Sequence, residues 1–194
     1  MSCSLVGSEM CIRDSYGGNL KDAQIPRFGM NFTIPEEYSD VVWYGRGPHE
    51  NYIDRKSSAF VGLYESSVED LGFDYSRPQE NGYRTDVRWF KVSNKDKIGF
   101  EIRGEPLISF SAHYNTIEDF DDGLIPQKAG EKLAVRQRLV KMQRKPVDVP
   151  KRDFISLNID LKQMGVGGDN SWGARTLPKY TINPGNYSYS FTVI

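Results

Sequence analysis

Twelve residues near the end of the chain, MGVGGDNSWGAR from Met164 to Arg175, combine four glycines with one acid and one tryptophan. Glycine-rich loops of this kind bind phosphates, form tight turns or hold a single side chain in place. A dinucleotide site needs a third glycine where Asn170 stands and a helix after it, and neither is found. Gly45-Arg46-Gly47 fails the same test at Glu50. The pattern therefore argues against a nucleotide site and leaves a loop built around one indole.

The spacing of the histidines, serines and acids gives little support for metal binding or nucleophilic catalysis. The histidines, His49 and His113, lie far apart and have no ligand-spaced partner, and no serine stands in a G-x-S-x-G sequence. The acids Asp119, Asp121 and Asp122 carry the oxygen ligands that hard cations prefer, but such a run is typical of a solvated loop. We predict no metal site and no catalytic residue within this chain.

Carbohydrate is the substrate class that suits the remaining features, because sugars present apolar C–H faces beside hydroxyl groups. Rings that recur at every second position, Trp43 and Trp89 among them, are predicted to be core. Trp172 lies outside any such period, directly after Asp169, Asn170 and Ser171. The spacing alone favours equally a tryptophan buried under its loop and one displayed at a sugar site.

The elements that must position this loop are predicted to be short strands. Apolar residues alternate with polar ones in residues 28–34, 41–44, 83–89, 98–114, 155–161 and 187–193. In the third of these, Tyr83, Thr85, Val87 and Trp89 are expected to share a face. The turn at 183–186 is expected to close a C-terminal hairpin. The sequence therefore predicts an all-β, antiparallel β-sandwich.

Two segments do not follow this pattern. Residues 127–144 are basic, lack proline and stop before Pro146, which favours equally a surface helix and a charged flexible insertion. Residues 1–20 have no hydrophobic period, and their opening MSCSLVGSEMCIRDS resembles a translated sequencing adaptor. We expect residues 1–20 to be a non-native or disordered leader and residues 21–194 to form the domain.

Length and charge limit the function classes. The 194 residues are enough for one domain, and 26 acids against 25 bases argue against nucleic-acid binding and against a membrane surface. No apolar run of about eighteen residues is present, so we expect no spanning helix. Cys3 and Cys11 show no metal-type spacing.

Three long runs carry a family resemblance: WYGRGPHENYIDR (43–55), RPQENGYRTDVRWF (77–90) and LNIDLKQMGVGGDNSWG (157–173). In order and spacing they resemble the C-terminal, or small chain, domain of bacterial β-galactosidases of glycoside hydrolase family 2. The resemblance implies a supersandwich of the galactose-mutarotase-like type that is truncated at its N-terminal side. Because missing strands expose sheet edges and core, we expect this partial domain alone to be marginally stable or prone to aggregation.

The resemblance also implies a function, the hydrolysis of terminal β-D-galactosides such as lactose. Retaining glycosidases use two carboxyl groups, and in this family both glutamates lie in a TIM barrel that is absent here, where Mg and Na ions could also bind. Trp172 is implied to stack on the sugar at its aglycone side. The implied loop-shaping residues are Gly165, Gly167, Gly168, Asp169, Asn170 and Ser171. A further set of matching residues is interpreted as structural networks or domain contacts: Glu50, Asn51, Arg55, Glu80, Asn81 and Arg84.

Several alternatives stay open at this stage. The partners implied are the remaining domains, or a separate large subunit, of a bacterial enzyme that is a homo-oligomer when intact. The cytoplasm and the periplasm are both allowed. A free-standing carbohydrate-binding or mutarotase-like module is the alternative from another class. Mutarotase chemistry would require a histidine and a carboxylate that converge in a cleft, and neither His49 nor His113 has that sequence context.

Overall fold

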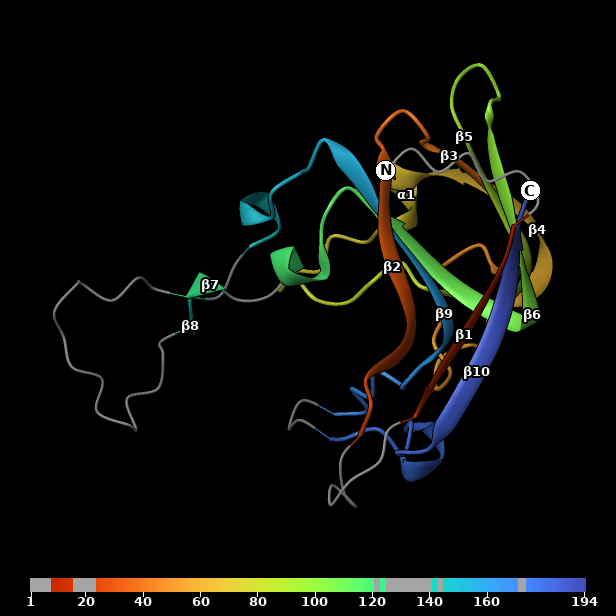
Figure 1. Ribbon diagram of the computed structural model, residues 1–194. Coiled ribbons are helices and arrows are strands. Elements are labelled where there is room, and N and C mark those ends of the chain that lie inside the picture. The colour runs from red at the N-terminus through yellow and green to blue at the C-terminus, as the bar shows by residue number, and fades with distance from the viewer. Residues whose placement is uncertain (1–7, 16–23, 121–122, 125–140, 143–144, 171–173) are drawn as a thin grey trace, which may run out of the picture.

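The computed structural model describes residues 8–15, 24–120, 123–124, 141–142, 145–170 and 174–194, and its regular elements are almost all strands (Figure 1). Eight of the strands form one antiparallel sheet: β1 Ser8–Ser15, β2 Arg27–Pro35, β3 Asp40–Gly47, β4 Phe60–Ser67, β5 Arg84–Ser93, β6 Gly99–His113, β9 Phe154–Gln163 and β10 Asn186–Val193. Two-residue strands β7 (Gly123–Leu124) and β8 (Lys141–Met142) pair separately. The helical turns are α1 Val68–Leu71, η1 Ile117–Phe120, η2 Pro146–Asp148 and η3 Pro178–Tyr180.

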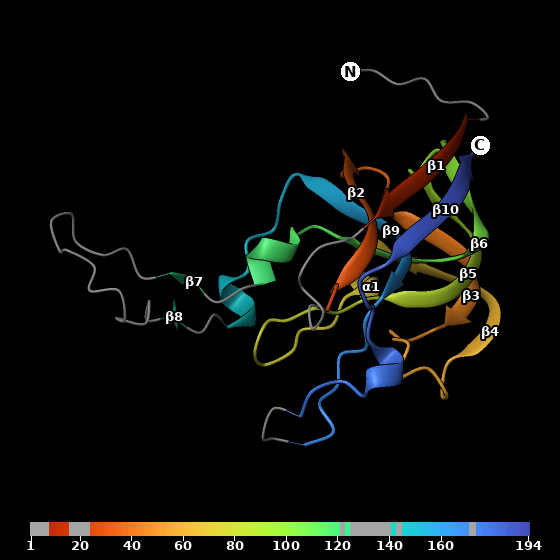
Figure 2. The same cartoon turned by 60° about the horizontal axis from the view of Figure 1, so that its bottom comes forward.

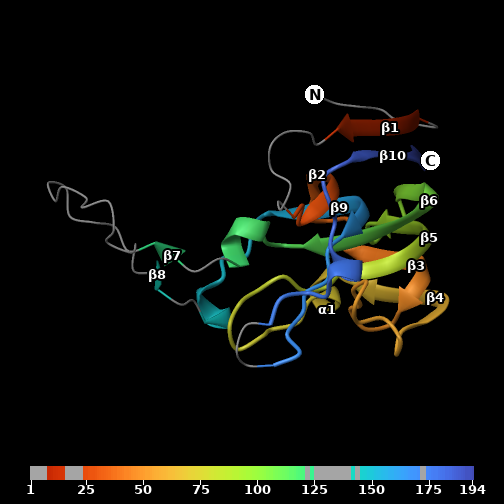
Figure 3. The ribbon, with the colours of Figure 1, turned by 90° about the horizontal axis from the view of Figure 1, so that it is seen from below.

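The sheet divides in two along the long strand β6. One branch runs in the order β1-β10-β6-β5-β3-β4, as Figure 3 shows from below. The first half of β6 pairs with β10, and its second half pairs with β9, which in turn pairs with β2. The ring of Phe28 on β2 lies 5.4 Å from that of Tyr187 and 5.9 Å from that of Tyr189 on β10. The two branches therefore pack face to face, as in a β-sandwich.

One apolar core fills the space between the branches. Phe110 of β6 stacks on Phe90 of β5 at 4.4 Å and meets the edge of Trp43 of β3 at 6.0 Å. Ile155 and Leu157 of β9 are fully buried beside them. Each such side chain stabilises the fold by about 1.5–3 kcal/mol relative to an exposed one. The core thus confirms the predicted all-β antiparallel class and the inward face of residues 155–161.

The face predicted for residues 83–89 is wrong. The pairing of β5 with β6 shifts register between Arg84 and Val87 and again between Val87 and Trp89, and Asp86 has a φ of +54°. Between Arg84 and Val87 strand β5 carries one residue more than β6, and between Val87 and Trp89 strand β6 carries three residues more than β5, so the regular alternation of faces is interrupted here. As a result Phe90 enters the core, whereas Trp89, expected in the core, is only partly buried.

The predicted C-terminal hairpin is also wrong, because β10 pairs with β6 and β1 and not with the segment before it. Among the described residues of that preceding segment, Ile182 makes an isolated β-bridge to Ile25. A two-stranded hairpin needs a strand directly before the turn, and the described parts of this segment, residues 164–170 and 174–183, form none.

The two segments that were set apart in the sequence analysis are described only in part. Ser8–Ser15, expected outside the fold, forms β1 along the whole of β10 and covers an otherwise unpaired sheet edge. Within residues 127–144, only Lys141–Met142 is described, as strand β8; the helix or insertion expected there otherwise lies outside the described residues. No helix in the described ranges is long and apolar enough to cross a membrane.

Candidate functional site

The three sequence runs that carry the family resemblance meet at one side of the sheet. They contribute the loop between β3 and β4, the segment before β5, and β9 with the loop after it. Figure 2 shows the loop after β9 beside the loop between β3 and β4, below the sheet. A backbone bond joins the first two runs, since Asn51 N–H donates to the Tyr83 carbonyl at 2.7 Å. Met164 N–H of the third run donates to the carbonyl of Pro26, directly before β2, at 2.9 Å.

A series of stacked rings and guanidinium groups lies at the centre of this region. The rings of Tyr52 and Tyr83 stack 5.5 Å apart at an interplanar angle of 11°, and both side chains are buried. The Arg27 guanidinium lies 5.5 Å from the ring of Tyr83, and the Arg55 guanidinium lies 5.2 Å from the ring of Tyr52. Cation–π attraction and ring stacking together hold residues from β2, the first run and the second run in one rigid unit.

The buried amides of this region bond to backbone groups. Asn51 accepts hydrogen bonds from the Thr85 N–H at 2.9 Å and hydroxyl at 2.6 Å, and donates to the His49 carbonyl at 3.0 Å. Asn81 accepts from the Phe73 N–H at 3.1 Å and donates to the Gln79 carbonyl at 2.9 Å. These bonds hold the loops in place, since buried polar groups are costly when they are unpaired.

Arg84 and Glu50 are the charged members of the same network. The Arg84 guanidinium donates to the carbonyls of Leu71, Gly82 and Pro48, each at 2.9 Å, and burial lowers its pKa to about 10. The Glu50 carboxylate accepts bonds from Arg55 at 2.6 Å, from the Gly82 N–H at 2.8 Å and from the Tyr75 hydroxyl. Both side chains thus link loops that are distant in sequence.

Glu80 and Asp160 are carboxylates that share the partner Arg27. Arg27 donates to Glu80 at 3.0 Å and to Gln163 at 2.7 Å, and its Nε lies 3.2 Å from Asp160 Oδ2. Asp160 is fully buried and accepts a bond from the Tyr83 hydroxyl at 3.0 Å. Burial raises its pKa to about 7 against the attraction of Arg27. Burial likewise raises the pKa of Glu80 above its usual value.

The glycine-rich loop begins directly after Gln163 and is held by a residue that the sequence analysis did not single out. The Asp54 carboxylate accepts hydrogen bonds from the N–H groups of Val166 at 3.2 Å and Gly167 at 2.8 Å. Gly167 and Gly168 have φ angles of +64° and +85°, which favour glycine. The only signal for Asp54 in the sequence was its place in the run from Trp43 to Arg55.

The residues predicted to form the tip of this loop are placed only in part. Trp172 and Ser171 lie outside the described residues. Asp169 and Asn170 are exposed, and the Asn170 side chain accepts a long bond of 3.4 Å from the Ala174 N–H across the tip. The described geometry therefore fixes the two ends of the loop and leaves the sugar contact of Trp172 a prediction.

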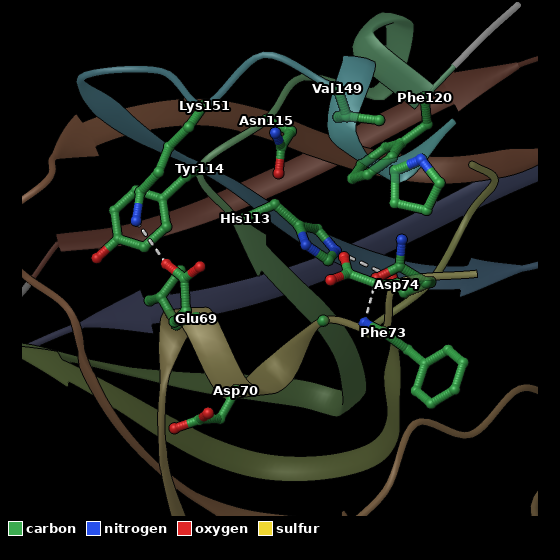
Figure 4. A pocket seen from close by; sticks show the side chains of 14 residues that line it. Glu69, Asp70, Phe73, Asp74, His113, Tyr114, Asn115, Phe120, Val149 and Lys151 are labelled. Carbon is green, nitrogen blue, oxygen red and sulfur yellow. Dashed lines mark hydrogen bonds and ion pairs between the residues drawn. The ribbon is translucent and has the colours of Figure 1, made fainter. Parts of the chain in front are cut away.

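A pocket of about 440 Å³ lies next to His113, and Asn81 of the network is among the residues that line it (Figure 4). His113 Nε2 lies 2.9 Å from the Asn81 carbonyl, and burial lowers its pKa to about 4. Glu69, Asp70 and Asp74 line the pocket, but Glu69 pairs with Lys151 and no carboxylate among the described residues bonds to His113. His113 is therefore neutral near pH 7 and a poor general base, unlike the histidine that mutarotase chemistry requires.

The described ranges bring together no group of three or more His, Cys, Asp or Glu side chains that could hold a metal ion. The acid Asp119 from the run considered above is instead bonded to Arg152, at 2.5 Å and 3.0 Å. Its partners Asp121 and Asp122 lie outside the described residues.

The fold and this region define an antiparallel β-sandwich domain that presents a glycine-rich loop on a rigid polar base. Comparison with known families assigns it: the chain belongs to the β-galactosidase small chain family, whose model matches residues 6–193.

Individual relatives agree with this assignment. A β-galactosidase of Priestia megaterium is 37% identical over 186 residues, which are 95% of this chain and 16% of that protein. A β-galactosidase of Vibrio cholerae is 32% identical over 169 residues, or 87% of this chain and 14% of that protein. One of Halalkalibacterium halodurans is 32% identical over 161 residues, with shares of 82% and 14%. The chain thus spans about a sixth or less of the length of these relatives.

Proposed function

We propose that this chain is the small-chain part of a β-galactosidase that hydrolyses terminal β-D-galactosides such as lactose. The observation that carries the proposal is the match of residues 6–193 to the small chain family, together with relatives that are all named β-galactosidase. Because the chain corresponds to only 14–16% of these relatives, the activity belongs to the whole enzyme.

The catalytic glutamates of the proposed enzyme lie outside this chain. Retaining glycosidases need one carboxylate free to attack and one carboxylic acid free to donate a proton. Around the glycine-rich loop, Glu50 accepts three hydrogen bonds, Asp54 accepts two, and Glu80 and Asp160 are paired with Arg27. Because these carboxylates are engaged in hydrogen bonds and ion pairs that hold the loops, they are poor candidates for the nucleophile or for the acid.

The contribution of this chain is the loop that carries Trp172. Our proposal is that Trp172 stacks on the sugar at the aglycone side of the active site. Support comes from the described ends of the loop. Asp54 binds the backbone of the segment that leads to the tip, where two glycines have positive φ, and the Thr176 hydroxyl of the returning segment donates to the Gly165 carbonyl. An indole held in place loses little entropy on binding, and its flat face suits the apolar face of a sugar.

The test uses a chimaeric enzyme in which this chain replaces the matching part of the Priestia megaterium β-galactosidase. The purified chain alone should not release nitrophenol from nitrophenyl β-galactoside, whereas the chimaera should. Loss of a stacking contact of about 1 kcal/mol predicts that Trp172→Ala raises KM for lactose about fivefold. Trp89→Ala serves as the matched control, since Trp89 lies on a strand and not in the loop.

Two results would contradict the proposal. Hydrolysis by the chain alone, sensitive to a substitution within it, would place catalytic groups here. Equal lactose kinetics for the parent and Trp172→Ala chimaeras would contradict the proposed contact of Trp172 with the aglycone side of the sugar.

Calorimetric binding of galactose by the chain alone would instead support a free-standing carbohydrate-binding module. Activity that appears only when a separate large subunit is added would identify a natural small subunit.

A further inference from the structure

We propose that Asp54 is a positioning residue for the loop after β9: its carboxylate holds Val166 and Gly167 and thereby sets the conformation of the segment that leads to Trp172. The effect on the sugar rests on the function proposed above. The effect on the loop rests only on the geometry of described residues.

The contact is a two-oxygen acceptor site for two successive backbone N–H groups. Oδ1 of Asp54 accepts from Val166 at 3.2 Å, and Oδ2 accepts from Gly167 at 2.8 Å. Hydrogen bonds to a carboxylate are about twice as strong as those between neutral groups. Neither N–H joins a strand ladder, so the carboxylate replaces the pairing that a strand would supply at this bend.

Asp54 is itself held rigidly before it meets the loop. It lies in a tight turn that is closed by reciprocal backbone bonds between Tyr52 and Arg55, at 3.1 Å and 2.8 Å. Tyr52 is anchored by its stack on Tyr83, and Arg55 is tied to Glu50 at 2.6 Å. The turn therefore holds the Asp54 carboxylate in a fixed position, to which Val166 and Gly167 bind.

The fit between Asp54 and the loop leaves no room for a side chain at Gly165. A Cβ atom on Gly165 would lie 2.5 Å from the Asp54 carboxylate and 2.8 Å from the Thr176 methyl group. On the far side, the Thr176 hydroxyl donates to the Gly165 carbonyl at 2.7 Å. The outgoing and returning segments of the loop are thus joined to each other and, through Asp54, to the first sequence run.

This arrangement separates a positioning role from a general structural one. Asp54 is only partly buried, and its carboxylate accepts hydrogen bonds from two N–H groups of one loop. Its loss should therefore alter the loop and spare the core. By contrast, Asn51 in the same run bonds to β5 and supports the sheet itself.

The substitution that tests this is Asp54→Asn, which keeps the size of the side chain but replaces one acceptor oxygen with an NH₂ group. That group would face a backbone N–H donor, so at least one of the two bonds is lost. Asp96→Asn is the matched control, because Asp96 lies in an exposed turn away from the loop. Both variants are made in the 194-residue chain and in the chimaeric enzyme.

The first measurement is amide hydrogen exchange in the 194-residue chain. We expect exchange at Val166, at Gly167 or at both to accelerate at least about tenfold in Asp54→Asn, since at least one charge-assisted hydrogen bond is lost. Exchange in the core strand β9 should stay unchanged, and Asp96→Asn should change neither. Unaltered exchange at Val166 and Gly167 would overturn the proposal.

The second measurement is the kinetics of the chimaera. Asp54→Asn should raise KM for lactose about two- to fivefold with little change in kcat, and never more than Trp172→Ala does. An equal fall in kcat for every substrate would mean general damage and would overturn the positioning role. If Trp172→Ala changes KM but Asp54→Asn does not, this inference fails alone; if Trp172→Ala has no effect, the proposed function fails instead.

Discussion

The carboxyl group of Asp160 offers the sharpest test of the buried network. It lies in the middle of β9, fully buried, 3.2 Å from Arg27 Nε and 3.0 Å from the Tyr83 hydroxyl. Its second oxygen has no hydrogen-bond partner among the described residues. Burial raises its pKa to about 7, against an ordinary value of 3.8, although Arg27 and Tyr83 favour the ionised form.

The sign of the pH effect follows from this difference. Between about pH 4 and pH 7 the unfolded chain releases the Asp160 proton while the folded chain keeps it. The folded state is therefore favoured most below pH 4, and this contribution is lost as the pH rises to about 7. At 1.36 kcal/mol for each pKa unit, the loss is on the order of 4 kcal/mol.

The assay compares the 194-residue chain with Asp160→Asn by urea unfolding at pH 4, 5.5 and 7. Subtracting one curve from the other cancels the remaining titrating groups, including His113, whose pKa of about 4 makes the folded state less stable as the pH falls below about 6.5. We expect Asp160→Asn to gain stability relative to the parent as the pH rises. If the parent gains instead, or if the difference is constant, Asp160 is ionised in the folded protein and the reasoning is refuted.

Two further predictions concern the loops and the sheet edge. Asn51→Ala should lower the free energy of unfolding by about 2–4 kcal/mol in urea titrations, because it leaves the buried Thr85 N–H and hydroxyl unpaired; Asn94→Ala in an exposed turn should cost about 1 kcal/mol or less, and equal losses would contradict this. Leu63 is 66% exposed on β4, a terminal strand of the described sheet, so Leu63→Glu should reduce aggregation as measured by light scattering. The free energy of unfolding should change by no more than about 0.5 kcal/mol. Unchanged scattering would show that aggregation starts elsewhere.

The network shows why only part of the site could be predicted. The family resemblance singled out three runs of sequence, and residues of these runs bond to one another in the network. Asp54 was missed because its two partners lie 112 and 113 residues away in the chain. No local period or spacing in the sequence records a contact of that kind.

The buried polar face of β9 was missed for a similar reason. Alternation predicts that Ser156, Asn158 and Asp160 point away from the core, and they do. They are nevertheless buried, because neighbouring strands and loops cover this face. Asn158 bonds there to Ser111 and Asn31, each at 2.9 Å. A period of two distinguishes the faces of a strand, but it does not show what covers each face.

By itself, the sequence determined the all-β antiparallel class, the inward face of β9 and the family. Those properties follow from alternation within single strands and from motifs that stand whole in the sequence. The tertiary structure decided the register shifts beside Trp89, the partners of β10 and the contact of Asp54 with the loop after β9. These depend on where distant segments meet, and that is set by the packing of the whole sheet and not by any one stretch of residues.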